Sequence, residues 1–76
     1  MSNQARDYFE DAFWQIKKEG KTISVSYAVE NIIDFGYEVD EAEVEELCNA
    51  FSYDGELDSE AFINACLKLG LDQYVN

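Results

Sequence analysis

The sequence predicts an all-α protein of four helices, arranged as two helix–loop–helix units. Three observations lead to this expectation. Apolar residues recur at helical spacing in four segments, glycines fall where those segments end, and the second half of the chain repeats the first. Each half also contains a short extended stretch between its two helices, so the repeating unit is helix, loop and helix.

The first two helices are defined by their apolar stripes and by their ends. The first is expected over about residues 4–18, with a stripe of Ala5, Phe9, Ala12, Phe13 and Ile16. Ser24 can cap the second helix. This helix is expected to stop at Gly36, because glycine readily adopts the left-handed backbone conformation that often ends a helix. Its apolar positions are Ala28, Val29, Ile32, Ile33 and Phe35.

The third and fourth helices follow the same pattern. Asp40 is expected to cap the third helix, with Glu43 as its capping-box partner. The buried stripe of that helix contains Val44, Leu47, Cys48 and Phe51. Asp58 is expected to cap the fourth helix, which ends at Gly70. Its apolar positions are Phe62, Ile63, Ala65, Cys66 and Leu69.

The two halves of the chain align at two slightly different spacings. Ile23 matches Leu57 and Gly36 matches Gly70 at one spacing, whereas Phe9, in the helix before the loop, matches Val44 at a spacing one residue larger. The first loop is therefore expected to be one residue longer than the second. Because 76 residues hold one small core, we expect a single domain over 1–76, with units at about 4–36 and 40–70 and a tail at 71–76.

Composition narrows the classes of function. The chain has 17 acidic and 5 basic residues and a net charge of -12, which favours a basic partner and disfavours nucleic acid and anionic membrane; solubility alone is the alternative. There is no histidine and no glycine-rich phosphate loop, and both cysteines fall on apolar helix faces, so we expect neither catalytic residues nor a zinc site. Without a long apolar run or a secretory signal, the chain is expected to be cytoplasmic.

Three fragments, in this order, resemble the EF-hand family, specifically one lobe of calmodulin, troponin C or a myosin light chain. Residues 9–13 (FEDAF) resemble the start of a first EF-hand, residues 40–44 (DEAEV) the start of its third helix, and residues 60–62 (EAF) the segment that follows a loop. The likeness covers residues 9–70. Because paired EF-hands join through short strands, it implies that residues 22–24 pair antiparallel with residues 56–58.

The loops depart from that family. A calcium-binding EF-hand loop needs about twelve residues, alternating oxygen ligands and a final bidentate glutamate. The two loops here span residues 17–27 and 52–61, both shorter, with Lys17 at the first ligand position and Tyr27 and Ala61 in place of the glutamates. We therefore expect degenerate loops with no metal and no cofactor. The alternative is a loose cation site among the carboxylates of the second loop, Asp54, Glu56, Asp58 and Glu60.

The resemblance implies a light chain of the single-lobe kind that serves class I unconventional myosins. Such a chain binds an IQ-motif helix of the heavy chain without calcium and stabilises the lever arm, in association with the actin cytoskeleton. We expect a monomer when it is alone, and no direct membrane binding. The runner-up function is a calcium-responsive EF-hand sensor or a small dimeric EF-hand regulatory protein.

The residues expected to hold the helix form an apolar groove with an acidic rim. Ordinary core packing and a solvated helix face are the respective alternatives. Trp14 lies one position off the buried stripe, so it is expected either to contact the partner or to be covered by the tail. The groove candidates are Phe13, Ile16, Ile32, Phe35, Leu47, Phe51, Phe62, Ala65 and Leu69, and the rim candidates are Glu43, Glu45 and Glu46.

Overall fold

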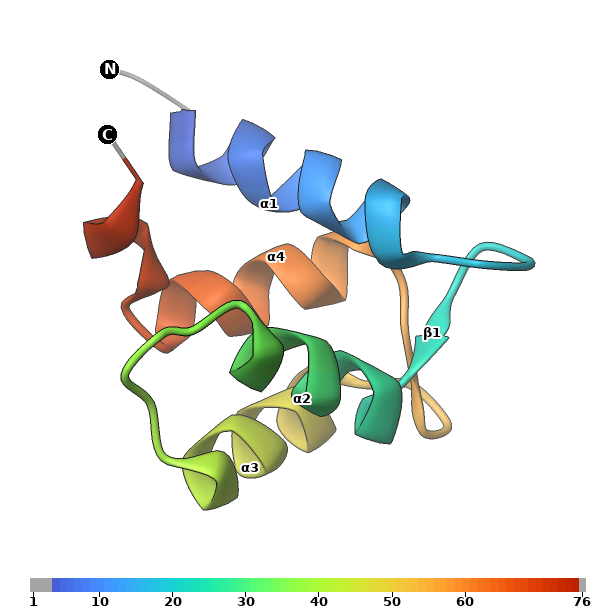
Figure 1. Cartoon of the computed structure of the whole chain (residues 1–76). Coiled ribbons are helices and arrows are strands. Elements are labelled where there is room, and N and C mark those ends of the chain that lie inside the picture. Colours follow the sequence, from blue (N-terminus) through green and yellow to red (C-terminus); the bar gives the residue numbers. More distant parts are fainter. Residues whose placement is uncertain (1–3, 76) are drawn as a thin grey trace.

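The computed structural model describes residues 4–75 and shows the expected mostly helical architecture (Figure 1). In that range the chain forms four helices, a two-stranded ladder and a final 3-10 turn. The elements are α1 (Gln4–Ile16), β1 (Ile23–Ser24), α2 (Val25–Asp34), α3 (Glu41–Phe51), β2 (Glu56–Leu57), α4 (Ser59–Lys68) and η1 (Leu71–Tyr74). The all-α class and the four predicted helices are confirmed.

The helices pack in a chain of neighbours. Figure 1 shows α4 between α1 on one side and α2 and α3 on the other. The most extensive contacts join α1 with α4, α3 with α4, and α2 with α3. The molecule can therefore be described as two helix pairs, α1 with α4 and α2 with α3, that meet where α3 packs on α4. No helix within residues 4–75 is long and apolar enough to cross a membrane.

The ladder joins the two halves of the chain. Ile23 pairs with Leu57 and Ser24 with Glu56 in antiparallel register. Both apolar members, Ile23 and Leu57, are buried. The predicted antiparallel pairing is confirmed, with each strand one residue shorter than expected.

The helix ends agree with the sequence in all but two details. Ser24 accepts a hydrogen bond from the Tyr27 amide at 3.2 Å, and Asp58 accepts one from the Ala61 amide at 2.8 Å. Gly36 and Gly70 have φ values of 88° and 79°, as their positions after α2 and α4 require. Asp40 precedes α3 as expected, but its side chain makes no capping hydrogen bond.

The predicted capping box is therefore wrong, and acidic residues in the first turn of α3 supply the favourable interaction with the helix dipole instead. The other difference is in α1, which ends at Ile16 rather than at about residue 18.

One core contains residues from all four helices and the ladder. Its fully buried large side chains include Phe9, Phe13, Ile32, Val44, Leu57, Phe62 and Leu71. Two aromatic residues that the sequence placed on buried stripes are exposed: Phe35 at 39% and Phe51 at 36%. Phe35 directly follows the last residue of α2, and Phe51 is the last residue of α3. Helical periodicity thus predicts burial correctly in the middle of the helices and incorrectly at these two helix ends.

Truncation of Phe62 should destabilise the protein far more than truncation of Phe51. Phe62 is fully buried, with its ring centre 5.7 Å from that of Phe13, so Phe62→Ala should lower the free energy of unfolding by about 3–5 kcal/mol. The loss for Phe51→Ala should be smaller, about 1 kcal/mol, because Phe51 is 36% exposed in the folded protein and buries less apolar surface. Urea denaturation followed by circular dichroism measures both, and equal losses would contradict this description of the core.

Candidate functional site

Loop 1, between α1 and β1, is closed by a hydrogen bond within the protein. The hydroxyl of Tyr27, in the first turn of α2, donates to the carbonyl oxygen of Ile16, the last residue of α1, at 2.5 Å. The Nζ of Lys18 lies 5.6 Å from the centre of the Tyr27 ring and adds a cation–π contact. Tyr27 is the residue that the sequence analysis aligned with the final glutamate of a calcium-binding loop. It thus connects the two helices directly.

Loop 2, between α3 and β2, is closed by its backbone. The amide of Tyr53 donates to the carbonyl of Glu56 at 2.8 Å, and the amide of Glu56 donates back at 3.0 Å. Between them, Asp54 and Gly55 have φ values of 58° and 79°, which is the geometry of a two-residue hairpin turn. The Gly55 carbonyl accepts from the Val25 amide at 3.2 Å, so the turn is also attached to the start of α2.

The carboxylates near loop 2 are used in contacts with the protein. Thr22 donates to Glu56 at 2.8 Å, Asp58 caps α4, and Glu60 forms an ion pair with Arg6. Asp54, Glu56 and Asp58 line a hollow of about 440 Å³. Across residues 4–75, however, no three His, Cys, Asp or Glu side chains are grouped closely enough to hold a metal ion. The described geometry gives no support to a cation site in loop 2.

The nine predicted groove residues do not form an open groove in this structure. Phe13, Ile32, Phe62 and Ala65 have no exposed surface and belong to the core. Ile16, Leu47 and Leu69 are partly buried. Among these and the exposed Phe35 and Phe51, Ile16 and Phe35 line one hollow and Phe51 lines another. In this conformation the four core residues are not accessible to a partner.

A hollow lies between α1 and the end of α2. We call it the α1/α2 hollow; its volume is about 310 Å³, and its lining is Tyr8, Asp11, Ala12, Gln15, Ile16 and Phe35. Two predicted groove residues, Ile16 and Phe35, therefore meet at the surface. Extensive packing between α1 and α2 is absent here, and the hydrogen bond from Tyr27 to Ile16 joins the two helices instead.

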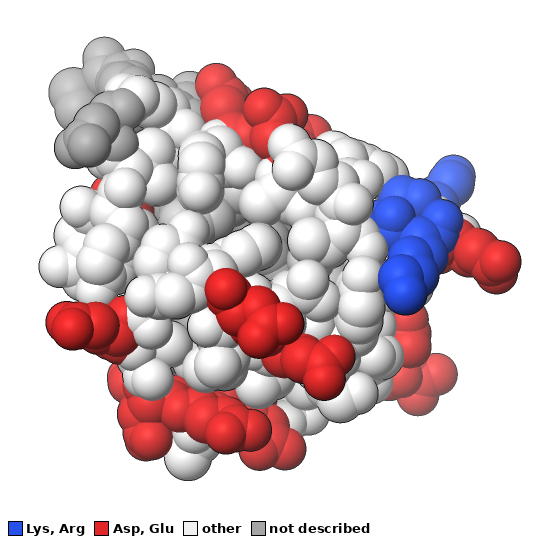
Figure 2. Space-filling view, in the orientation of Figure 1, with Lys and Arg blue, Asp and Glu red and all other residues white. Residues whose placement is uncertain are grey.

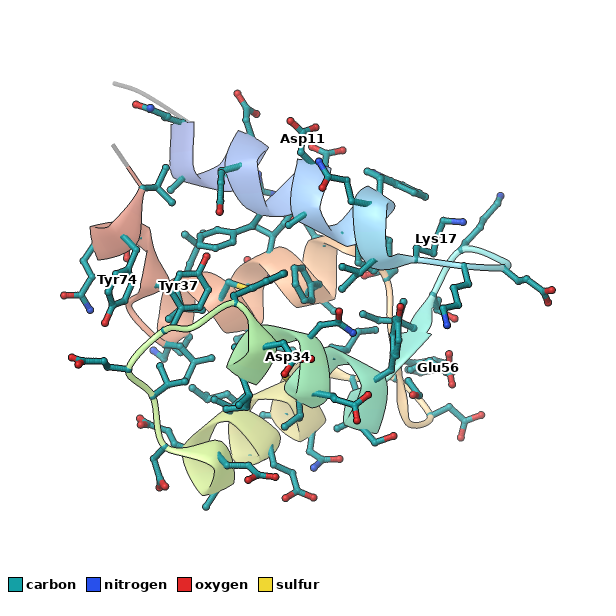
Figure 3. All side chains as sticks on the ribbon, in the orientation of Figure 1. Asp11, Lys17, Asp34, Tyr37, Glu56 and Tyr74 are labelled. Carbon is teal, nitrogen blue, oxygen red and sulfur yellow. The ribbon has the colours of Figure 1, made fainter. Side chains whose placement is uncertain are left out.

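Tyr37 fastens the connection between α2 and α3 to the rest of the protein. Figure 3 shows Tyr37 beside Tyr74 of η1. Its ring centre lies 5.0 Å from that of Tyr74 and 5.7 Å from that of Phe35. Burial, followed by a hydrogen bond with Tyr8, raises the pKa of Tyr37 above its usual range. These contacts connect α1, the α2–α3 connection and the tail, beside the α1/α2 hollow. The sequence analysis did not single out Tyr37, although an aromatic residue next to Gly36 was a visible signal.

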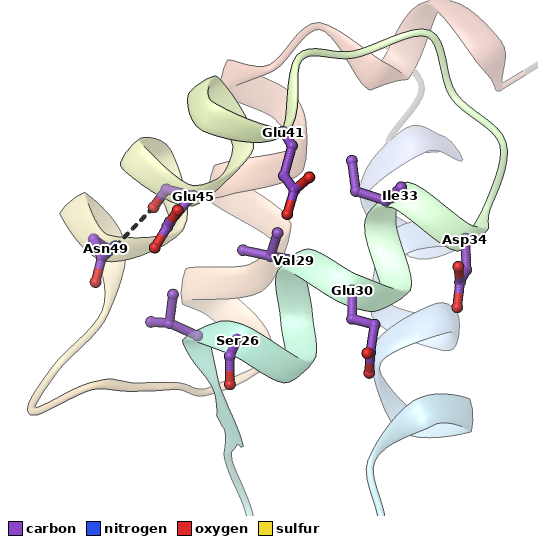
Figure 4. Close-up of a pocket in the computed structure, with 9 residues that line it drawn as sticks. Ser26, Val29, Glu30, Ile33, Asp34, Glu41, Glu45 and Asn49 are labelled. Atoms are coloured by element: carbon purple, nitrogen blue, oxygen red, sulfur yellow. Dashed lines mark hydrogen bonds between the residues drawn. The ribbon is translucent and has the colours of Figure 1, made fainter.

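A further hollow, larger than the two described above, lies between α2 and α3 (Figure 4). We call it the α2/α3 groove; its volume is about 470 Å³. Val25, Val29 and Ile33 of α2 supply its apolar lining. Figure 4 shows Val29 and Ile33 pointing toward α3. Glutamates from α3 also line it, so this groove combines an apolar surface with negative charge.

The three predicted rim glutamates are divided by the structure. All are exposed on α3, but of the three only Glu45 lines the α2/α3 groove, where it is joined by Glu41. Glu43 and Glu46 line none of the hollows described above. Sequence periodicity identified the exposed positions of α3 but could not show that α2 packs beside them. The sequence analysis therefore missed the groove and did not identify Glu41, Glu30 and Asp34 as part of its lining.

Trp14 is 48% exposed in the last part of α1. Its ring meets the edge of Phe13 at a centroid distance of 5.1 Å, and the Lys17 Nζ lies 5.4 Å from its centre. Tyr74 of the tail instead stacks on Tyr37, and Leu71 is buried in the core. Of the two expectations for Trp14, covering by the tail gains no support from these contacts, and contact with a partner stays a prediction.

Comparisons of the chain with protein-family models, curated proteins and solved structures find no match. The support for any function therefore comes from the loops, the hollows and the charge distribution.

The hydroxyl of Tyr27 should contribute measurably to stability. Tyr27→Phe keeps the ring beside Lys18 but leaves the Ile16 carbonyl without this donor, so the free energy of unfolding should fall by about 1 kcal/mol. Tyr53→Phe is the matched control, because Tyr53 is 87% exposed and should lose almost nothing. Urea denaturation at neutral pH compares them. Equal stability of Tyr27→Phe and the unaltered protein would mean that the hydrogen bond does not hold loop 1 closed.

The buried thiols should make the protein less stable at alkaline pH. Cys48 and Cys66 are free and buried; burial raises the pKa of Cys48 to about 11 and that of Cys66 further. Because burial favours the neutral thiol, its stabilisation is complete below the unfolded pKa of about 8.5 and is lost as the pH rises above it.

The comparison with Cys66→Ala isolates this effect from the tyrosines and lysines. The stability advantage of the unaltered protein over Cys66→Ala should shrink by up to about 1.4 kcal/mol for each pH unit above 8.5. Urea denaturation between about pH 7 and pH 10 measures it. An advantage that stays constant over this range would contradict a buried neutral thiol at Cys66.

Proposed function

We propose that this chain is an EF-hand-like lobe that binds a basic amphipathic helix without calcium, as a light chain for an IQ motif of a class I myosin. The observation that carries the proposal is the closure of both loops by the protein's own hydrogen bonds. Tyr27 with Ile16 in loop 1, and Tyr53 with Glu56 in loop 2, provide connections that an EF-hand sensor obtains from a metal ion. The helix–loop–helix order and the antiparallel ladder are compatible with such a pair.

The charge of the chain supports a basic partner. The net charge is -12, and within residues 4–75 the one ion pair is that of Arg6 with Glu60. Figure 2 shows acidic side chains spread over the face in view, while its basic side chains gather at the edge formed by the loop after α1. A helix that carries arginine or lysine would reduce the mutual repulsion of these carboxylates.

Partner binding requires the closed lobe to open. The α1/α2 hollow is the proposed point of entry, because Ile16 and Phe35 already line it. Separation of the α1–α4 pair from the α2–α3 pair would expose Phe13, Ile32, Phe62 and Ala65 to the apolar face of the helix. A partner that binds only the open state can stabilise it through its differential affinity, without a metal ion.

The composition of this core favours binding to one dedicated partner over binding to many different partners. Adaptable grooves of the calmodulin type are rich in methionine, whereas the one methionine here is Met1. We propose a cytoplasmic protein associated with the actin cytoskeleton, with a role in binding rather than catalysis.

Titration with a synthetic IQ-motif peptide in the presence of EDTA tests this function. We expect saturable binding in the micromolar range or tighter, followed by the fluorescence of Trp14, and little change when calcium replaces EDTA. Phe35→Ala should weaken binding by about tenfold, because it removes an apolar contact at the point of entry. The matched control is Tyr53→Ala, which removes an aromatic side chain that is far more exposed than Phe35 and does not line the α1/α2 hollow. It should leave the affinity unchanged.

Two results would overturn the proposal. Absence of binding to IQ-motif peptides would remove the light-chain function. A saturable calcium transition in Trp14 fluorescence, without peptide, would favour the calcium-responsive alternative.

A further inference from the structure

The α2/α3 groove has the shape and lining of a binding site that needs no opening of the core. Its apolar lining, Val25, Val29 and Ile33, recurs every fourth residue and follows α2 along its length. A volume of about 470 Å³ falls within the range of roughly 300–1,000 Å³ typical of sites for molecules the size of a few side chains. This surface exists in the closed lobe, unlike the predicted inner groove.

Carboxylates flank this apolar stripe on both sides. Figure 4 shows Glu41 and Glu45 pointing from α3 toward α2, while Glu30 and Asp34 lie on the outer flank of α2. None of the residues that line the groove is basic, and none of these four carboxylates is in an ion pair within residues 4–75. The C-terminal end of α2, at Asp34, adds the negative end of a helix dipole. The groove is therefore an unneutralised negative site.

The spacing of the carboxylates selects the kind of cation. Across residues 4–75 no three acidic side chains are close enough together to hold one metal ion. Several positive charges spread along the groove would meet the four carboxylates better than a single ion can. Lysine and arginine also carry aliphatic stems that pack on apolar surface while the charged ends stay among carboxylates and water. A peptide segment with such side chains matches both the lining and the charge.

We propose that the α2/α3 groove is a preformed docking surface for a short lysine- or arginine-bearing peptide segment of a partner protein. The aliphatic stems lie over Val25, Val29 and Ile33, and the charged ends meet Glu41 and Glu45 on one side and Glu30 and Asp34 on the other. The site is separate from the α1/α2 hollow and does not depend on the helix-binding function proposed above.

Charge reversal on α3 tests the site with a closely matched control. The double variant E41K/E45K places two lysines in the groove, whereas E43K/E46K makes the same change in net charge on exposed positions of the same helix that do not line it. The probe is a fluorescein-labelled peptide of roughly three helical turns, with arginine at alternating three- and four-residue spacing and no large apolar side chain, so that it lacks the apolar face of an IQ-motif helix. Fluorescence anisotropy at about 0.1 M salt measures the affinity.

E41K/E45K should weaken peptide binding by at least about tenfold, and E43K/E46K by no more than about threefold. When the peptide is added to the unaltered protein, the largest changes in amide NMR chemical shift should lie along α2 from Val25 to Ile33 and at Glu41 and Glu45. Circular dichroism establishes whether both variants keep their helix content. If E41K/E45K does not fold, Ser26→Lys is the alternative variant, because Ser26 is an exposed residue of the groove lining and the lysine places a positive charge there. It should weaken peptide binding by about threefold or more.

Three results would overturn the docking surface. Equal weakening by E41K/E45K and E43K/E46K would mean that only overall charge attracts the peptide. Amide shifts confined to Tyr8, Ile16 and Phe35 would place the peptide in the α1/α2 hollow instead. Binding of spermine as tight as that of the peptide would identify a site for small polycations. Failure of the light-chain function is distinguishable, because loss of IQ-peptide binding leaves the response of this probe to E41K/E45K unchanged.

Discussion

The pairing of Ile23 with Leu57 is the contact on which the arrangement of the four helices depends. Both side chains are buried, and each lies two residues before the first residue of its helix, α2 or α4. The intervening residues, Ser24 and Asp58, cap those helices with side-chain oxygens. The ladder thus sets the starting point of one helix in each pair, and the burial of Phe13 against Phe62 follows from the positions that α1 and α4 then occupy.

The two loops are held shut by different chemistry. Loop 1 depends on one side-chain hydroxyl, that of Tyr27, whereas loop 2 depends on reciprocal backbone bonds between Tyr53 and Glu56. Because a side chain can be replaced without altering the backbone, loop 1 is the more easily modified of the two. Loop 2 depends instead on two residues, Asp54 and Gly55, that tolerate left-handed backbone. In both, the connection between helices is made by groups of the protein.

The sequence was a good guide to the helices, the ladder and most caps, because these depend on local periodicity and on short-range hydrogen bonds. Ser24 and Asp58 followed their pattern, while the Asp40 side chain did not, since a residue type alone does not determine the orientation of a carboxylate. The candidate site was harder to predict. Burial of Phe13 and exposure of Glu45 follow from helical phase, but the groove beside Glu45 depends on where α2 packs, which no periodicity reveals. The contacts of Tyr37 with Tyr8 and Tyr74 likewise join three distant segments.

The two surfaces proposed for basic partners differ in what binding must overcome. Opening at the α1/α2 hollow would expose buried side chains such as Phe13 and Phe62 of one helix pair and Ile32 of the other, so the partner must cover an equivalent apolar area before any net affinity results. The α2/α3 groove is already formed, and its carboxylates lack basic partners within the described chain, so binding there removes repulsion and breaks no core contact. Affinity at the groove should therefore fall steeply with salt, while affinity for the opened lobe should depend mainly on the apolar face of the helix. Under these two proposals, a partner with both a basic segment and an amphipathic helix binds the α2/α3 groove first, and this contact raises the effective concentration of the helix beside the α1/α2 hollow.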